Sequence, residues 1–398
     1  MGRLIHYPEQ RALEDAAYAH GLVPTRIFTV LLPVWRVEVQ ATVTDAEDYA
    51  LIDRYLERAI GECGVDTAPD LARFLSLDEV VVDRALRFLL AIEHVHVADG
   101  RFALTPLGVR SVLDQKSYRL SRHDRRKLYF DAFGSRPLTR PYYDSGVVTL
   151  IERHEARTAL NAVGGRGFML ANTPAFRREA LTELAQATER DAFNLPARID
   201  DPQSIAEEYV YLPLYLVRAA RTQRPPRYLA YSQISDESDP YLTSICEHTE
   251  EIVSACEHDS TPDEQSERDR IDEWLSRRDL GRNRPTRTAE GTWRVTLPAA
   301  AFGRAGALGS SQLGSYIVLG NFFFHAWCAD VPARRRALLE RVNAYLGARS
   351  NFDEGALTKR VEQMSRQLEL GTVDLGTVYR WAAAAGRSQL AAQLASFN

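Results

Sequence analysis

Two repeated tripeptides hold residue types that bind zinc. Cys246-Glu247-His248 and Cys256-Glu257-His258 lie ten positions apart. Zinc needs four ligands at about 2.0–2.3 Å in a tetrahedral arrangement. The first tripeptide lies within a helical pattern from Asp239 to Ala255 and the second follows it; if the segment is one helix, ten residues span about 15 Å. One metal ion cannot bridge that distance, so we expect two half-buried cysteines, two surface histidines and no metal.

Glycine-rich segments are a second place where chemistry could lie. Gly164-Gly165-Arg166-Gly167 lacks both the G-x-G-x-x-G spacing and the preceding strand of a dinucleotide-binding fold. This absence also argues against a methyltransferase. Gly309-Ser310-Ser311-Gln312-Leu313 carries leucine where a nucleophile elbow needs its last glycine. Both segments are therefore predicted to be loops, and no cofactor is expected.

Paired carboxylates are a third candidate for catalysis. Asp200-Asp201 and Glu207-Glu208 are typical of helix caps and solvated loops, and the only lysines for a nuclease site are Lys116, Lys127 and Lys359. The nine histidines show no Ser/His/Asp or HExxH arrangement. The sequence predicts no catalytic residue, and an enzyme would need a site built from residues distant in sequence.

The elements that could position a binding surface gather in residues 46–115. Apolar residues recur at three- and four-residue spacing in Ala46–Cys63, Ala68–Leu75 and Asp78–Ile92, which predicts three helices. A hairpin follows at Val95–Thr105, and another helix begins at Pro106. The residues expected to face inward are Leu51, Tyr55, Leu56, Ala59, Ile60, Leu71, Ala72, Leu75, Val81, Ala85, Leu86, Leu89 and Leu90.

Local signals mark the ends of these elements. Gly64 is expected to end the first helix, and Thr67 and Asp78 to cap the next two. Asp99-Gly100 predicts a two-residue hairpin turn, because both turn positions need a positive φ.

The run TAPDLARFLSLDEVVVDRALRFLLAIEHVHVADGRFALTPLGVRSVL, Thr67 to Leu113, resembles the winged helix-turn-helix superfamily of bacterial regulators. The resemblance implies that the third helix enters the major groove of duplex DNA and the hairpin contacts the backbone. Because the net charge is -5, phosphate contacts must come from a local patch, which we place in the basic segment Ser117–Arg140. The predicted DNA-binding residues are Arg84, Arg87 and Arg101 at the grooves, with Arg119, Arg122, Arg125, Arg126 and Lys127 at phosphates.

The third helix departs from the usual DNA-reading pattern. Its Asp78, Glu79 and Asp83 lie beside only two arginines and repel phosphate. Similar modules serve dimerisation in small-molecule methyltransferases and protein contacts in complexes. Two hypotheses are therefore preferred to that of an enzyme. The first is a non-enzymatic DNA-binding transcriptional regulator. The second is a scaffold subunit that contacts a homodimer mate or another protein.

A second, shorter stretch resembles the strand pair of WYL-type sensor domains. Tyr211 to Ser232 contains Pro213-Leu214 and then Arg227-Tyr228-Leu229-Ala230-Tyr231, with Arg227 in place of the leading tryptophan. Such domains follow winged helices in bacterial regulators, some linked to phage defence. The resemblance implies a nucleic-acid ligand and a role in antiviral defence.

The whole chain is expected to be α+β, with the winged helix attached to a mixed β body and a helical C-terminal region. Arg26–Thr44 alternates like a strand, is split or placed at an edge by Pro33, and should pair with later strands. Tyr316–Cys328 is expected to be one buried strand. The predicted segments are 1–45, with a helix and strands; 46–118, the winged helix; 119–257, a basic connector and mixed region; 258–292, a charged linker with one short helix near Trp274; and 293–398, strands and three helices.

Targeting signals are not evident. The N-terminus lacks a basic-then-apolar leader, and no apolar run reaches the ~18 residues that span a bilayer. The four cysteines are few and scattered, which suits reduced thiols. We expect a cytoplasmic bacterial protein with no membrane partner.

Overall fold

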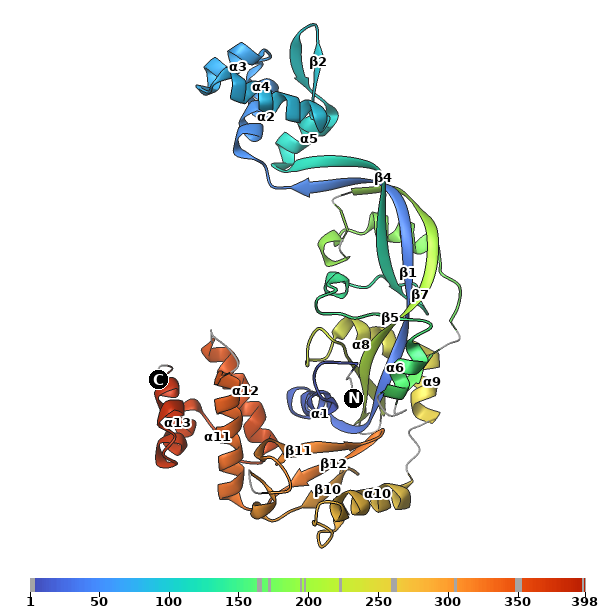
Figure 1. Ribbon diagram of the computed structural model, residues 1–398, viewed down its shortest axis with the longest axis vertical. Coiled ribbons are helices and arrows are strands. Elements are labelled where there is room, and N and C mark those ends of the chain that lie inside the picture. Colours follow the sequence, from blue (N-terminus) through green and yellow to red (C-terminus); the bar gives the residue numbers. More distant parts are fainter. Residues whose placement is uncertain are drawn as a thin grey trace. The chain divides into compact units, whose positions relative to one another are not determined.

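The computed structural model describes residues 4–162, 167–170, 173–193, 195–196, 198–221, 224–258, 263–303, 306–347, 353–395 and 397, without the side chains of 121–123, 190–191 and 224 (Figure 1). The chain divides into two units. Unit 1 comprises residues 1–33, 149–172 and 211–398, and unit 2 comprises residues 34–148 and 173–210. The fold is α+β with several sheets and a C-terminal helical region, which confirms the predicted class.

Strand β1, Val23–Glu47, contributes residues to both units. It pairs in parallel with β6, Gly167–Met169, and antiparallel with β4, Ser117–Asp131. The predicted pairing with later strands is thus confirmed. Pro33 does not split the strand, because it lies between these two registers and its missing N–H interrupts neither. The segment after residue 117, expected as a connector, is a strand up to Asp131.

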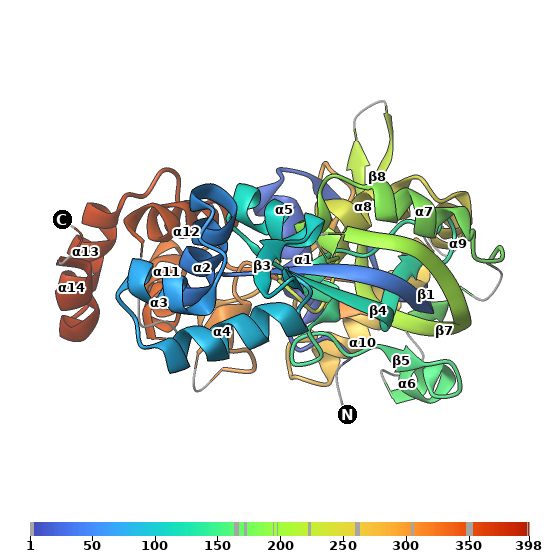
Figure 2. The ribbon, with the colours of Figure 1, turned by 90° about the horizontal axis from the view of Figure 1, so that it is seen from above.

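The sheet of unit 2 combines parts of β1 and β7 with β4. Figure 2 shows β4, β1 and β7 (Arg198–Arg221) running side by side in that order. Helix α7, Glu179–Gln186, packs on this sheet through Leu181 and Leu184. Trp35 of β1 stacks on Tyr209 of β7 with ring centroids 3.8 Å apart, so this ring pair helps to hold the two strands together in the core of the unit.

Unit 2 also contains a helix-hairpin module, defined here as Leu51–Asp114. Thr67 and Asp78 cap the second and third helices as predicted, and Gly64 ends the first with φ 67°. Asp99 and Gly100 both have positive φ, which confirms the hairpin turn. The module's elements are α2 (Leu51–Cys63), α3 (Ala68–Leu75), α4 (Glu79–Ala91), β2 (Val95–Ala98), β3 (Arg101–Leu104) and α5 (Pro106–Asp114).

In unit 1, β7 and β8 form the expected antiparallel strand pair, for instance with Tyr215 opposite Tyr231. The helical stretch predicted from Asp239 to Ala255 breaks near Thr249 into two helices. The elements around this pair are α1 (Glu9–Glu14), a π-helix (Asp15–Ala19), β5 (Ile151–Glu152), α6 (Ala156–Ala162), β8 (Arg224–Tyr231), α8 (Pro240–Glu247) and α9 (Glu250–His258).

A second sheet in unit 1 has the strand order β11-β12-β10-β9. The single strand predicted at Tyr316–Cys328 is wrong, because Gly320 has φ 91° and turns the chain into an antiparallel pair. The segment expected to be a charged linker with one short helix near Trp274 holds a 13-residue helix, α10, whose Ile271 and Leu275 are buried. The elements are α10 (Glu264–Ser276), β9 (Pro285–Arg287), β10 (Trp293–Thr296), β11 (Ser315–Leu319) and β12 (Phe322–Trp327).

The C-terminal region has four helices where three were predicted. Gly386, with φ 68°, breaks the last predicted helix in two. The helices share a core that includes Leu338, Val361, Val378 and Leu390. Their bounds are α11 (Val331–Gly347), α12 (Glu354–Gln367), α13 (Leu375–Ala384) and α14 (Ser388–Ala395). In the part of the chain that the structure describes, no helix has the length and apolar character needed to cross a bilayer.

Candidate functional site

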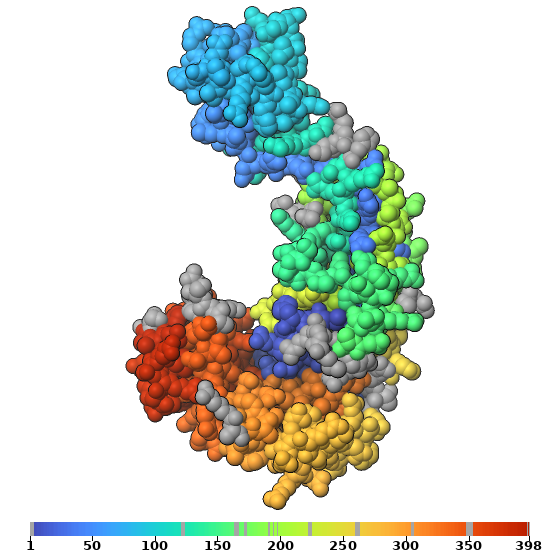
Figure 3. Space-filling model, in the orientation of Figure 1, coloured from blue at the N-terminus to red at the C-terminus, as the bar shows by residue number. Residues whose placement is uncertain are grey.

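Exposed apolar side chains concentrate on the helix-hairpin module. Of the sixteen large apolar side chains exposed in the described chain, twelve belong to the module, although it is a small part of the sequence. Single exposed apolar residues are ordinary, but a concentration of them marks an interaction surface. Figure 3 shows the module's atoms, in blue to cyan, as a rounded lobe with its own surface. The twelve residues are Leu51, Ile52, Tyr55, Phe74, Leu77, Val80, Val81, Phe88, Leu90, Val97, Val109 and Leu113.

The module carries more apolar residues than its core can bury. In α4 the buried stripe is Val82, Leu86 and Leu89, at spacings of four and three. The predicted stripe was partly wrong, because Val81 and Leu90 are exposed, and in α2 so are Leu51 and Tyr55. Leu56, Ala59 and Ile60 of α2 and Leu71 and Ala72 of α3 are buried as predicted, while Ala85 and Leu75 are partly buried against the same core.

A buried polar cluster fixes the base of the module. His94 Nδ1 bonds to the Glu57 carboxylate and Nε2 to the Tyr118 carbonyl, and Glu57 also accepts the Tyr49 hydroxyl. Burial lowers the pKa of His94, but these hydrogen bonds outweigh burial and raise that pKa above its ordinary value. Two acceptors at the two ring nitrogens suit a protonated imidazole. The cluster ties α2 to the hairpin and to the start of β4.

Two of the three arginines predicted at the grooves are held by carboxylates. Arg87 pairs with Asp83 one helical turn away. Arg101 pairs with Asp66 at 2.8 Å between Nη1 and Oδ2. Arg84 is exposed and, within the described part of the chain, makes no ion pair.

The arginines predicted at phosphates lie on β4 and face carboxylates. Arg119 lies 3.1 Å from Glu47 and Arg125 3.9 Å from Glu38. Arg126 bonds to two carboxylates, Asp45 at 2.8 Å and Asp124 at 2.6 Å.

Two further predicted phosphate contacts have a different outcome. Lys127 is exposed, and its charge helps to lower the pKa of the Glu208 carboxyl, after the larger effect of Arg36. Arg122 lies in β4, but its side chain is outside the described residues.

The charge balance of this region is acidic. Residues 46–118 contain thirteen aspartates and glutamates against eight arginines and lysines. Polyanions are attracted by unpaired positive charge, so ion pairing and net negative charge both oppose phosphate binding. The structure thus places the predicted residues on one module and its adjoining strand, but it surrounds most of them with acids.

A serine, histidine and aspartate cluster, missed in the sequence, lies in unit 1. Ser238 Oγ is 2.9 Å from His20 Nε2, and Asp15 Oδ2 is 3.3 Å from the same nitrogen. A catalytic relay needs the acid at the other ring nitrogen. Asp15 instead accepts bonds from the Tyr231 hydroxyl and the Ser238 N–H. The cluster therefore anchors the loop after β8 to the π-helix, and burial raises the pKa of Asp15 there.

The surface near this cluster holds an open pocket of about 410 Å³ between Ser232 and Tyr241. In unit 2 a second open pocket of about 610 Å³ is lined by polar residues such as Thr182 and Gln186. Its charged wall is internally paired, with Arg198 Nε 2.8 Å from Asp200 Oδ1.

The two cysteine tripeptides are separated by the break between two helices. Cys246 lies in α8 and Cys256 in α9, both fully buried where we expected half-burial, and His248 and His258 are exposed as predicted. Within the described ranges no group of three or more metal-ligating side chains comes together. Of the glycine-rich segment predicted to be an ordinary loop, Gly164–Arg166 lies outside the described residues, and Gly167 begins β6.

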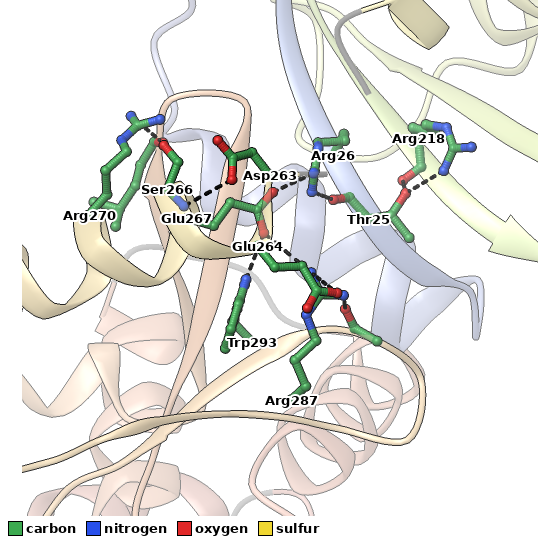
Figure 4. Close-up of polar contacts among 12 residues, drawn as sticks. Thr25, Arg26, Arg218, Asp263, Glu264, Ser266, Glu267, Arg270, Arg287 and Trp293 are labelled. Carbon is green, nitrogen blue, oxygen red and sulfur yellow. Dashed lines mark hydrogen bonds and ion pairs between the residues drawn. The ribbon is translucent and has the colours of Figure 1, made fainter. Parts of the chain in front are cut away.

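A charged network in unit 1 has a structural role. Figure 4 shows Glu267 of α10 accepting bonds from Arg26 of β1 and from Trp293 of β10. Arg287 of β9 approaches the same carboxylate at 3.4 Å. Glu267 and Arg26 are both buried, so the hydrogen bonds of this network form within the unit and hold α10 on the sheet, while Arg26 Nε has no hydrogen-bond partner among the described residues.

Family models, curated protein sequences and solved structures show no match to this chain. The function is therefore inferred from the geometry of the module.

Proposed function

We propose that the helix-hairpin module is a winged helix used for protein contact, and that the chain is a non-enzymatic assembly subunit. The observation that carries this proposal is the group of twelve exposed apolar side chains on the module. Interfaces between proteins have apolar centres surrounded by polar rims, and a few well-buried anchors supply most of the affinity.

The free energy of association favours a contact that covers several apolar side chains over one that covers a single side chain. Burying one valine, leucine or phenylalanine side chain contributes about 1.5–3 kcal/mol. Association costs roughly 4–15 kcal/mol in lost freedom of the two partners. Several of the exposed residues, such as Leu51, Val80 and Leu113, must therefore be covered together for stable binding.

The same geometry favours protein over DNA. A DNA-reading helix presents hydrogen-bonding side chains at its N-terminal end to base edges. Here that end carries Asp78, Glu79, Val80 and Val81, all exposed. Recognition of duplex DNA stays a prediction that depends on Arg84 and Lys127. The hypothesis of a sensor domain at Tyr211–Ser232 is independent of the module and also stays a prediction.

Site-specific photo-crosslinking in the protein's own cells tests the proposal. A photoreactive amino acid at Val80 or Leu113 should give a discrete adduct with another protein. The matched position is Ile205, an exposed apolar residue of β7 outside the module. Adducts at neither module position, or equally strong adducts at Ile205, would overturn the proposal.

Duplex DNA provides the second arm of the experiment. Fluorescence anisotropy at two salt concentrations should show no salt-sensitive binding of DNA by the full chain. Binding that weakens steeply with salt, and that is lost in an Arg84→Ala and Lys127→Ala double variant, would establish the DNA-binding function instead.

A further inference from the structure

The corner between α3 and α4 is the most concentrated part of the module's apolar surface. Every residue from Ser76 to Val81 is exposed. The exposed fractions are 56% for Phe74, 36% for Leu77, 76% for Val80 and 40% for Val81. Four large apolar side chains are thus exposed within eight residues, and the corner between the two helices keeps their backbone positions close together.

The corner is held rigidly by its own backbone. The Leu77 N–H donates to the Ala72 carbonyl at 3.0 Å, which closes the end of α3. Ser76 adopts a left-handed conformation with φ 56°. The Asp78 carboxylate accepts the Val80 N–H at 2.8 Å and begins α4. A partner can therefore bind this surface without the entropic cost of ordering its backbone, which favours affinity.

The charge at this corner is negative. Asp78 and Glu79 are exposed between Leu77 and Val80, and Glu79 makes no ion pair within the described part of the chain. Among the arginines of the two helices, Arg73 pairs with Asp70 and Arg87 with Asp83, and Arg84 makes no ion pair with either carboxylate of the corner within the described part of the chain. A ligand that covers the apolar side chains is consequently placed beside unneutralised carboxylates.

We infer that the α3-α4 corner binds a basic amphipathic segment of a partner protein, a helix with one apolar face bordered by lysine or arginine. This inference rests on the proposed function and specifies its contact and the chemistry of its partner. The apolar face covers Phe74, Leu77 and Val80, and the basic border meets Asp78 and Glu79. A second copy of the chain fits less well, since its own carboxylates would approach these.

A model peptide tests the chemistry directly. The probe is a fluorescent amphipathic helix of leucine and lysine, about 15 residues long, and its control has glutamate at each lysine position. The full chain should bind the lysine peptide at low salt and not the glutamate peptide. Val80→Asp should raise the Kd at least about tenfold, a change of about 1.4 kcal/mol, because it places a charge under the apolar face.

The matched control variant is Ile205→Asp, which changes an exposed apolar side chain of β7 outside the module. It should leave the affinity unchanged, with circular dichroism confirming that both variants fold. Absence of lysine-peptide binding, equal binding of the glutamate peptide, or equal loss in both variants would overturn the inference. Self-association that disappears in Val80→Asp would also overturn it, in favour of a second copy.

The inference and the proposed function fail in different ways. Strong protein adducts at Leu113 together with none at Val80 would leave the module a docking surface while removing the α3-α4 corner as its contact. Absence of adducts at both positions would remove the proposed function itself.

Discussion

Glu57 of α2 and His94 at the start of the hairpin form an ion pair in which both side chains are completely buried. The remaining nitrogen of His94 bonds to the Tyr118 carbonyl, so one imidazole connects three elements of unit 2. Breaking one partner of a buried pair costs much more than the pair contributes, because an uncompensated charge stays buried. This pair therefore makes the integrity of the helix-hairpin module sensitive to the protonation of a single side chain.

The module should be more stable at pH 6 than at pH 9. The pKa of His94 is raised in the folded protein, so the folded state binds a proton that the unfolded state releases near pH 6.5. The stabilisation is complete below that pH and is lost as the pH rises through the folded pKa. Hydrogen exchange of α2, corrected for intrinsic rates, should show this. His94→Gln should abolish the pH dependence of this exchange, and His96→Gln, at an exposed position, should retain it. Identical pH profiles in the two variants would show that His94 does not cause the dependence.

Unit 1 should show the opposite dependence through His325. Burial, aided by Arg294, lowers the pKa of His325 to about 4. The unfolded chain then binds a proton that the folded chain excludes, so stability is lost as the pH falls below about 6.5, by about 3 kcal/mol once pH 4 is reached. Urea unfolding followed by tryptophan fluorescence suits this test, because His325 stacks against Trp327 with centroids 5.4 Å apart. His325→Phe should flatten the acid side of the profile, and parallel profiles would refute the prediction.

Glu267 should be far more important for stability than its neighbour Glu264. Glu267→Gln leaves Arg26 buried without its countercharge and should cost about 3–5 kcal/mol. Glu264 is largely exposed and lies 3.6 Å from Arg287, so Glu264→Gln should change stability by less than about 0.5 kcal/mol. Urea midpoints read from tryptophan fluorescence measure both, and equal shifts would show that the buried network contributes little.

Gly108→Ala should disrupt the module. A Cβ at this position would lie 2.1 Å from the His94 carbonyl oxygen, so backbone must move, at a cost of at least about 2 kcal/mol. At Gly347, the last residue of α11, a Cβ has nothing within 4 Å, and alanine should be neutral or slightly stabilising. Thermal unfolding followed by circular dichroism compares the two. A similar effect from both would mean that α5 packs against His94 more loosely than the structure has it.

Local signals made the module predictable. Thr67, Asp78 and the Asp99-Gly100 pair each specify a cap or turn through bonds to residues within three positions, so the printed sequence contains both partners. The inward faces were less predictable. Three consecutive valines, Val80 to Val82, satisfy more than one helical stripe, and only tertiary packing selects Val82 for the core.

The ion pairs of the predicted binding residues could not be predicted from such local signals. Arg119 and Arg126 meet Glu47 and Asp45, acids some seventy to eighty positions earlier, only because β4 pairs antiparallel with β1. Treating residues 117–131 as a connector hid that register. The alternation of Tyr118 and Leu120, then Leu128 and Phe130, was the available sign of a strand.

The order in which the two units can fold during synthesis follows from how β1 and β7 are shared between them. Unit 2 ends at Val210, whereas unit 1 begins at residue 1 and needs everything from Tyr211 onward. During synthesis the N-terminal residues of unit 1 must wait for their partners while the whole of unit 2 leaves the ribosome. The exposed apolar side chains of the module are thus displayed before unit 1 is complete, which would let the proposed partner meet them on the nascent chain.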